Sequence, residues 1–216
     1  MPHLADIRRD YGTLAFDEHQ AADSPLVQFE RWFADALKSD PDDANAMTLS
    51  TVDDQGRPNA RLVLLKGMES GRFLFYTHYE SVKSVEINRT PFVALTFFWP
   101  RSARQVRIRG EVARISAAES DAYFASRPYK SQLAAVASKQ SSLLKNRAEL
   151  ERLFDARLQR EAQEDTPLCR PNDWGGYAVT PYEMEFWQGR DSRLHDRIQY
   201  TLDEPHQLWK KARLSP

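Results

Sequence analysis

Short apolar segments rich in β-branched residues alternate with turns over the first half of the chain. Two of the connections, at residues 53–56 and 69–71, end in glycine, which is typical of tight turns between antiparallel strands. Gly110 interrupts the last segment and indicates a β-bulge or a close approach of another backbone. The pattern predicts a β-meander with strands at residues 46–52, 58–66, 72–77, 92–99 and 104–115.

A helical period replaces the alternation in five other segments. The first has an apolar stripe made of Leu26, Phe29, Trp32, Phe33 and Leu37. Capping residues mark where helices begin: Ser24 before this one, and Ser81, Ser116 and Asn146 before later ones. Helices are therefore predicted at residues 25–38, 81–88, 116–127, 131–138 and from 146 onward, the last with a buried stripe of Leu150, Leu153, Phe154 and Leu158.

Strand patterns return after the helices, at residues 177–179, 183–188, 197–202 and 208–214. The late strands share a core with the early ones only if they join the same sheet. The predicted fold class is therefore mainly β, a barrel with peripheral helices packed outside it. Residues 25–216 are predicted to form one domain, preceded by a polar, mobile N-terminal arm at residues 1–24.

The composition narrows the classes of function. The chain has 216 residues, 30 of them Lys or Arg and 31 Asp or Glu, so a net charge of −1 gives no overall attraction to nucleic acid or membranes. A single cysteine, Cys169, excludes a disulfide within the chain, and the histidines lack metal-ligand spacing, so no metal site is predicted. Residues 1–20 lack a signal peptide's apolar core, and no apolar run approaches the ~18 residues of a membrane span. A cytoplasmic location is expected.

The segment at residues 185–197 carries the strongest chemical signal. If its end is extended, Arg193, His195 and Arg197 lie on one face, because side chains alternate along a strand. Two guanidiniums and an imidazole on one face favour an anionic ligand such as a phosphate or a carboxylate. The alternative is a solvated edge strand whose charges bind nothing.

Two cationic segments in the first half offer further anion sites. Arg61 and Lys66 fall on opposite faces of a regular strand, so they serve one ligand only at a bulge or a strand end. Otherwise they are two charges at the rim of an apolar strand. Ser81 begins a helix with Lys83 in its first turn, where free amides and the helix dipole attract anions. Such a helix start is more often a cap without a ligand.

Polar side chains also gather in two later segments. Residues 104–109 form an ordinary amphipathic strand, in which Gln105 alone suggests a function. Tyr123 and Arg127 lie one helical turn apart, and with Ser131 they supply hydroxyl and guanidinium donors that suit a phosphate monoester. No Gly-rich phosphate loop, Ser/His/Asp triad or paired-carboxylate motif accompanies these segments, so hydrolase and kinase chemistry has no support.

Taken in order, these segments resemble the pyridoxine (pyridoxamine) 5′-phosphate oxidase family over nearly the whole chain. The resemblance rests on Arg-Leu-Val-Leu-Leu-Lys ending at Lys66, Phe-Tyr-Thr ending at Thr77 with Ser81 and Lys83, Arg-Gln-Val from Arg104, Tyr-Phe-x-Ser-Arg-Pro from Tyr123, Ser-Lys-Gln-Ser-Ser from Ser138, Phe-Trp-Gln-Gly from Phe186 and Arg-Leu-His-Asp-Arg from Arg193. It implies an FMN-binding split β-barrel, present as a homodimer with FMN at each subunit interface. The implied reaction converts pyridoxine and pyridoxamine 5′-phosphate to pyridoxal 5′-phosphate while O2 is reduced to H2O2.

The resemblance also implies roles for individual residues. The positions expected to contact FMN are Arg61, Leu62, Val63, Leu64, Leu65, Lys66, Tyr76, Thr77, Lys83, Gln105, Gln140, Ser141, Trp187 and Arg197. Those expected to bind the substrate are Lys66, Tyr123, Arg127, Ser131, Arg193 and His195, with Arg8, Arg9, Asp10 and Tyr11 of the arm closing over it. Of these, Arg193 and His195 are expected to be catalytic, orienting the pyridine ring and helping the proton leave.

One position departs from the resemblance. The family usually has arginine directly before the lysine that matches Lys83, and this chain has Val82. A charge-assisted hydrogen bond is worth about 1.5–3 kcal/mol, so its loss predicts weaker FMN binding. Alternatively, another cationic side chain, such as Lys145 or Arg101, donates this hydrogen bond to the FMN phosphate instead.

Two rival functions stay open at this point. A phenazine-pathway FMN oxidase shares the fold and the Arg-Leu-His-x-Arg ending, but the complete set Lys66, Tyr123, Arg127 and Ser131 favours the vitamin oxidase. A non-catalytic flavin or pyridoxal-phosphate carrier requires a degraded flavin or substrate face. Apart from Val82, those positions are intact here.

Overall fold

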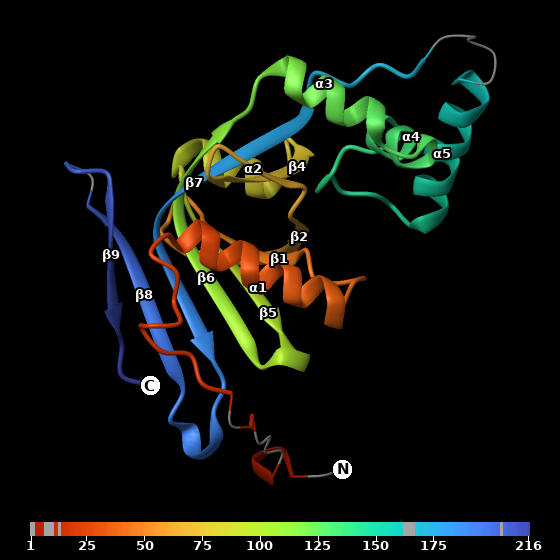
Figure 1. Cartoon of the computed structure of the whole chain (residues 1–216). Coiled ribbons are helices and arrows are strands. Elements are labelled where there is room, and N and C mark those ends of the chain that lie inside the picture. Colours follow the sequence, from red (N-terminus) through yellow and green to blue (C-terminus); the bar gives the residue numbers. More distant parts are fainter. Residues whose placement is uncertain (1–2, 7–10, 13, 162–166, 204) are drawn as a thin grey trace.

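Antiparallel strands form one sheet that curls into a half-barrel, with helices packed around it (Figure 1). The computed structural model describes residues 3–6, 11–12, 14–161, 167–203 and 205–216. The strands in this part of the chain are β1 (Ala46–Val52), β2 (Pro58–Leu64), β3 (Gly67–Glu69), β4 (Arg72–His78), β5 (Phe92–Trp99), β6 (Arg104–Arg114), β7 (Trp174–Gln188), β8 (Asp196–Asp203) and β9 (Leu208–Arg213). The fold class predicted from the sequence is confirmed.

The helices begin close to the predicted capping residues. They are α1 (Pro25–Ser39), α2 (Val82–Arg89), α3 (Ala117–Ser126), α4 (Tyr129–Ala137) and α5 (Arg147–Glu161), with short 3₁₀ turns η1 (Leu4–Asp6), η2 (Pro100–Ser102) and η3 (Asp191–Arg193). The capping box of α3 is complete, because the Ser116 side chain accepts from the Glu119 amide while the Glu119 carboxylate accepts from the Ser116 amide. No helix in the described residues is both long enough and apolar enough to cross a membrane.

Strand β7 joins the two groups of strands. The order along the sheet is β2-β1-β5-β6-β7-β4-β3, and β8 and β9 continue from the other half of β7. The first half of β7, from Trp174 to Val179, pairs with β4. The second half of β7, from Glu183 to Gln188, pairs with β8. The predicted addition of the late strands to the early sheet is therefore confirmed.

A β-bulge in β7, opposite Arg109 and Gly110 of β6, lies where β7 changes from pairing with β4 to pairing with β8. The register between β6 and β7 shifts between Arg109 and Gly110, and Gly110 lies opposite Pro181. A Cβ added at Gly110 would lie 2.5 Å from the carbonyl oxygen of Thr180, so only glycine fits without a shift of the backbone. The sequence predicted two strands here, at residues 177–179 and 183–188. The prediction of a break was wrong, because the bulge accommodates Pro181 within one continuous strand.

Aromatic side chains of α1 fill the concave face of the sheet. Phe29 is fully buried and meets the rings of Phe73 and Phe97 edge to face, each at 5.0 Å between ring centroids. Burial of such a side chain contributes about 1.5–3 kcal/mol to the free energy of unfolding. Leu37, which the pattern placed on the buried stripe, is exposed at the last turn.

Part of the predicted N-terminal arm packs against the domain. Phe16 and Ala21 are buried in the main core, and the Phe16 ring meets Trp32 at 4.8 Å between centroids. The amide of Phe16 donates to the buried carboxylate of Asp196. Residues 16–21 are therefore anchored on the C-terminal strands, and the mobility of the residues before them stays a prediction.

Helices α3, α4 and α5 form a lobe that extends away from the sheet (Figure 1). The predicted stripe on α5 is not buried within one chain: Leu158 is exposed, and Leu150, Leu153 and Phe154 are only half-buried. The periodicity identified the helix correctly. It did not indicate how much of the stripe other elements of the same chain cover.

Candidate functional site

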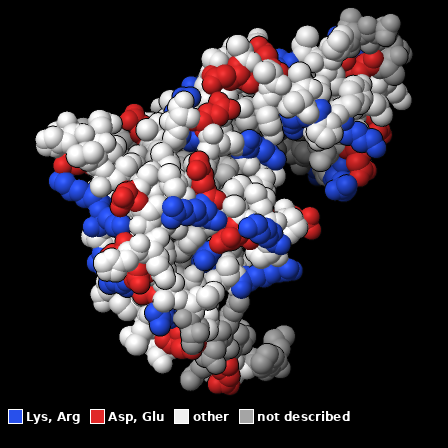
Figure 2. Space-filling view, viewed as in Figure 1, with Lys and Arg blue, Asp and Glu red and all other residues white. Residues whose placement is uncertain are grey.

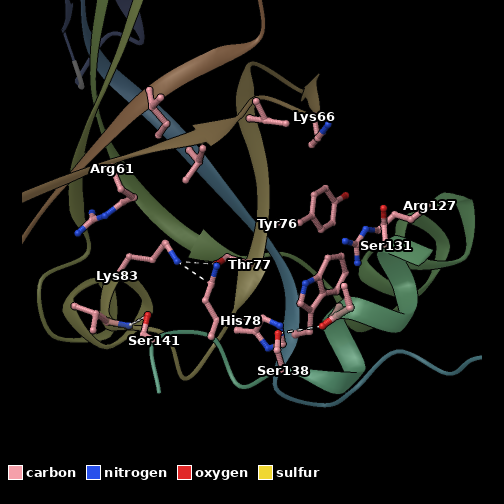
Figure 3. Close-up of a pocket in the computed structure, with 18 of the residues that line it drawn as sticks. Arg61, Lys66, Tyr76, Thr77, His78, Lys83, Arg127, Ser131, Ser138 and Ser141 are labelled. Carbon is pink, nitrogen blue, oxygen red and sulfur yellow. Dashed lines mark hydrogen bonds between the residues drawn. The ribbon is translucent and has the colours of Figure 1, made fainter. Parts of the chain in front are cut away.

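A cavity of about 970 Å³ lies between the sheet and the lobe of α3–α5. Figure 2 shows the corresponding hollow, with basic side chains on both of its sides. Its polar lining consists of Asn59, Arg61, Lys66, Tyr76, Thr77, His78, Lys83, Tyr123, Arg127, Ser131, Ser138, Gln140 and Ser141. Figure 3 shows Arg61 and Lys83 at one end, Lys66, Arg127 and Ser131 at the other, and Tyr76 between them. The size is that of a site for a cofactor or a drug-sized ligand.

Irregular backbone explains how Arg61 and Lys66 reach one cavity. Strand β2 ends at Leu64, after which the Leu65 amide donates to the Asn45 carbonyl and the Lys66 amide to the Leu74 carbonyl. The alternation of the strand is lost there, so both cationic side chains line the cavity. A strand end, one of the two conditions for a shared role, is present, and the strand predicted at residues 58–66 was two residues too long. Leu65 instead points into the core, where it is almost fully buried.

Lys83 is a buried ammonium surrounded by neutral oxygens. Its Nζ donates to Thr77 Oγ1 at 3.1 Å, to Ser81 Oγ at 3.1 Å and to Gln140 Oε1 at 2.9 Å. Burial, and then the nearby Arg61 guanidinium, lower the pKa of Lys83 to about 8. Below that pH the cavity holds a cation with no carboxylate within ion-pair distance among the described residues, which favours an anionic ligand.

Arg61 is held by a carboxylate that sequence reasoning missed. Its Nη2 donates to Glu86 Oε2 at 3.1 Å, and its Nη1 donates to the Leu49 carbonyl at 3.1 Å and to Thr51 Oγ1 at 2.5 Å. Burial alone would raise the pKa of Glu86, but hydrogen bonds from Asn59, Thr51 and Arg61 hold it below its ordinary value. The sequence contained one sign of this role: Glu86 follows Lys83 by three residues, so both lie on the same face of the helix.

The opposite end of the cavity carries a guanidinium donor without a partner. Arg127 Nη1 is buried and makes no hydrogen bond to any described residue, and the guanidinium packs over the Trp174 ring at 4.7 Å. Burial lowers the pKa of Arg127. Tyr123 stacks on Tyr76 at 3.7 Å between ring centroids. An orphaned cationic donor beside hydroxyl groups fits a second anion, and the aromatic wall between the two ends fits a planar ring system.

His78 is a second cavity residue that sequence reasoning did not find. It lines the cavity next to Thr77 and is almost fully buried. Burial lowers its pKa; the negative charge of Asp173 opposes this shift, and the positive charges of Lys83 and Arg127 reinforce it. The imidazole is therefore neutral near pH 7. The strand pattern did not single it out, because His78 lies in a run of polar and aromatic residues that includes Thr77 and Tyr79.

The remaining predicted residues form a separate group around Trp187, near the end of β7. Gln105 lies opposite Trp187 on β6 and β7, and Trp187 lies opposite Arg197 on β8. Tyr11 meets the rings of Trp187 and His195 at 5.4 and 5.6 Å. We call Tyr11, Gln105, Trp187, Arg193, His195 and Arg197 the hairpin group; none of them lines the cavity of the same chain. Arg8, Arg9 and Asp10 lie outside the described residues.

The expectation that Arg193, His195 and Arg197 share one strand face was wrong. Residues Asp191–Arg193 form the turn η3, with positive φ at Ser192 (57°) and Arg193 (62°), and β8 begins only at Asp196. Alternation therefore applies to Arg197 but not to the two residues before it. His195 instead accepts a hydrogen bond from the Arg190 amide at Nδ1, at 3.0 Å. Burial and the nearby Arg193 lower the pKa of His195.

A buried carboxylate neutralises Arg197. Its Nε donates to Glu185 Oε1 at 2.8 Å, while Arg107 Nη1 donates to the other oxygen of Glu185 at 3.1 Å. Glu185 is only 5% exposed. The charge of Arg197 is thus balanced within the chain by a carboxylate that it shares with Arg107, without a ligand.

The comparisons with known proteins cover almost the whole chain. The family described as pyridoxamine 5′-phosphate oxidase matches residues 33–159, and the pyridoxine 5′-phosphate oxidase C-terminal dimerisation region matches residues 174–216. A protein of Legionella pneumophila (strain Lens) named pyridoxine/pyridoxamine 5′-phosphate oxidase is 51% identical over 213 residues, 99% of this chain and 97% of that protein. One of Pseudomonas fluorescens (strain SBW25) with the same name is 49% identical over 215 residues, 99% of this chain and 98% of that protein.

Solved structures with the same fold include two relatives. PhzG from Burkholderia lata 383, in complex with tetrahydrophenazine-1-carboxylic acid, superposes with a TM-score of 0.87 at 27% identity, over 95% of this chain and all of that one. An FMN-binding protein related to pyridoxamine 5′-phosphate oxidase, from Nostoc punctiforme, superposes with a TM-score of 0.73 at 18% identity, over 90% of this chain and all of that one.

Proposed function

Because the chain belongs to the pyridoxamine 5′-phosphate oxidase family, we propose that it oxidises pyridoxine 5′-phosphate and pyridoxamine 5′-phosphate to pyridoxal 5′-phosphate with FMN as cofactor. The alcohol loses two electrons and two protons to O2, which becomes H2O2. The amine does the same, and hydrolysis of the resulting imine releases ammonia. When bound, FMN supplies the acceptor for the hydride from C4′ and the route of the electrons to O2.

The observation that carries this proposal is the pair of cationic ends in one cavity. Arg61 and Lys83 lie at one end, and Lys66 and Arg127 lie at the other, in a chain with a net charge of −1. A flavin phosphate and a substrate phosphate account for two separate anion sites. The aromatic wall that contains Tyr76 suits the ring systems that both ligands carry.

Specific residues follow from this division. Arg61, Thr77, Lys83, Gln140 and Ser141 hold the flavin phosphate end, and Lys66, Tyr123, Arg127 and Ser131 hold the phosphate of the substrate. The unpartnered Nη1 of Arg127 supports the second assignment, because a bound phosphate supplies the acceptor that the protein does not.

The hairpin group completes the site from a second subunit. In one chain this group lies outside the cavity wall, yet it contains the expected catalytic pair Arg193 and His195. The dimerisation region spans residues 174–216, which include most of the group. Leu62 and Leu64 on the cavity rim are 73% and 46% exposed, apolar surface that a partner would cover. We therefore place each active site between the cavity of one subunit and the hairpin group of the other.

His195 and Arg193 then act on the substrate ring. A depressed pKa keeps the imidazole of His195 neutral near pH 7, so it is able to take the proton released from the substrate hydroxyl or amine. The guanidinium of Arg193 orients the ring as a hydrogen-bond donor. Positioning by the two phosphate ends supplies much of the remaining rate enhancement.

An aerobic assay with matched substrates tests the function. Purified protein supplied with FMN should convert pyridoxine 5′-phosphate to pyridoxal 5′-phosphate and release one H2O2 per product, while unphosphorylated pyridoxine reacts far more slowly. Turnover of a dihydrophenazine but not of the phosphorylated vitamers would instead assign the activity to a phenazine-pathway oxidase. Bound flavin with no turnover of either substrate class would indicate a carrier.

A further inference from the structure

The anion-binding end at Arg61 and Lys83 contains a built-in negative charge. We propose that Glu86 is a positioning residue that both fixes the Arg61 guanidinium and offsets its charge, so that Lys83 supplies the net positive charge for the flavin phosphate. This inference rests on the proposed function, because it takes the flavin phosphate as the ligand of that end.

The contacts of Glu86 make it part of the cavity wall's support. The carboxylate is only 6% exposed, on the face of α2 that packs against β1 and β2. Besides Arg61, it accepts from Thr51 Oγ1 at 2.5 Å and from Asn59 Nδ2 at 2.9 Å. Three donors from two strands therefore fix both of its oxygens. Arg61 donates three N–H groups, to Glu86, to Thr51 Oγ1 and to the Leu49 carbonyl, and its other N–H groups are left for a ligand.

The two ends of the cavity differ in how their charge is balanced. Arg61 and Glu86 form an ion pair at 3.1 Å, so their charges cancel. Lys83 has only neutral partners among the described residues. At the substrate end no described carboxylate lies within ion-pair distance of Lys66 or Arg127. Among the described residues, a carboxylate of the same chain thus offsets a cationic charge only at the flavin phosphate end.

Glu86 also acts electrostatically on Lys83. Burial and Arg61 lower the pKa of Lys83, and the carboxylate of Glu86 opposes them. Among other nearby groups, His78 has a depressed pKa and adds no charge near pH 7. Removal of the negative charge of Glu86 should therefore let the Lys83 pKa fall further below about 8. Since the phosphate requires a charged Lys83, FMN affinity should then begin to fall at a lower pH.

The test is FMN titration of Glu86→Gln, followed by quenching of flavin fluorescence from pH 6.5 to 9. Gln has nearly the same shape, and its carbonyl can still accept from Arg61 and Thr51 while the Asn59 amide flips to accept from its NH2 group. At pH 6.5, where Lys83 is charged, binding should tighten about tenfold because the dianion meets one more net positive charge. The pH at which affinity starts to fall should move down.

Two further variants separate charge from shape. Glu86→Asp keeps the charge and should keep the wild-type pH dependence even if its affinity changes. Asp54→Asn removes a carboxylate that pairs with Arg89 of α2 outside this cavity, and it should change neither quantity. Melting temperatures of all variants report whether each one folds.

The outcomes distinguish the inference from the proposed function. Equal affinity and equal pH dependence in wild type and Glu86→Gln would overturn the role of Glu86, as would weaker binding with an unchanged pH dependence. If Glu86→Gln does not fold, a shifted pH dependence in Glu86→Asp would overturn it. Wild-type protein that binds no FMN would contradict the proposed function itself.

Discussion

At the scale of single residues, the protonation of Lys83 sets a pH limit on flavin binding. The pKa of Lys83 is lowered to about 8 by burial, and the second pKa of a phosphate monoester is about 6. Between these values the amine is charged and the phosphate is a dianion, so affinity for FMN should be highest there. Above pH 8 binding must include proton uptake, and affinity should fall by up to about tenfold per pH unit. A titration series from pH 5 to 10 measures this, and a flat profile above pH 8 would refute it.

Val82 is the residue at which this chain departs from the family. It lines the cavity beside Lys83, and its amide donates a long hydrogen bond, 3.4 Å, to Ser141 Oγ. Of the two donors suggested as substitutes, Arg101 donates to the Ser39 carbonyl, and neither Arg101 nor Lys145 lines the cavity of its own chain.

Val82→Arg should therefore tighten FMN binding by about tenfold or more, through one added charge-assisted hydrogen bond. Val85→Arg is the matched control, because Val85 is similarly exposed on the same helix but does not line this cavity. Equal FMN affinity in Val82→Arg and wild type, measured by fluorescence titration, would show that the missing arginine is of no consequence here.

At the scale of elements, periodicity predicted the helices and most strands because each buries one regular face. Strands β1 and β5 have the predicted bounds. The prediction failed where backbone geometry is irregular. At residues 191–195 two positive φ angles break the alternation, and at residues 181–183 a bulge within β7, where the pairing with β6 skips Tyr182, keeps the strand continuous through Pro181. A period of two or 3.6 carries no information about such local geometry.

The site was less accessible to sequence reasoning than the fold. Alternation alone left the relation of Arg61 to Lys66 open, and resemblance to a family supplied the residue set. Glu86 and His78 were missed because their importance depends on which strands lie against them. Contacts such as Glu86 with Thr51 join residues 35 positions apart, which local patterns do not encode.

Gly110 should be the most sensitive position of the sheet. Gly110→Val would place atoms within 2.5 Å of the Thr180 carbonyl oxygen and 2.6 Å of Val179 Cγ1, so β6 and β7 would have to separate. We expect a loss of at least about 2–3 kcal/mol in the free energy of unfolding, measured by urea denaturation. Glu111→Val, at an exposed neighbouring position on the same strand, should cost little. If the two variants had similar free energies of unfolding, the close approach of β7 would not be the reason for a glycine at position 110.

At the scale of the whole molecule, the predicted site residues fall into two groups that one chain keeps apart. The cavity carries both phosphate ends, and the hairpin group carries His195 and Arg193 on the matched dimerisation region. In a two-fold symmetric dimer, each hairpin group would face the cavity of the other subunit. The central claim is that the oxidase site exists only across this interface.

Purified heterodimers with two affinity tags test that claim most directly. One subunit carries Arg127→Ala in the cavity, and the other carries His195→Ala in the hairpin group. If each site combines two chains, one of the two sites is intact, and the heterodimer should oxidise pyridoxine 5′-phosphate at about half the wild-type rate although both parent homodimers are impaired.

The reciprocal heterodimer pairs a wild-type subunit with one that carries both substitutions. Here each site contains one defect if the sites are shared, so its activity should stay near that of the impaired homodimers. The opposite pattern, an impaired first heterodimer and a half-active second one, would show that each chain builds its own site and would contradict the central claim.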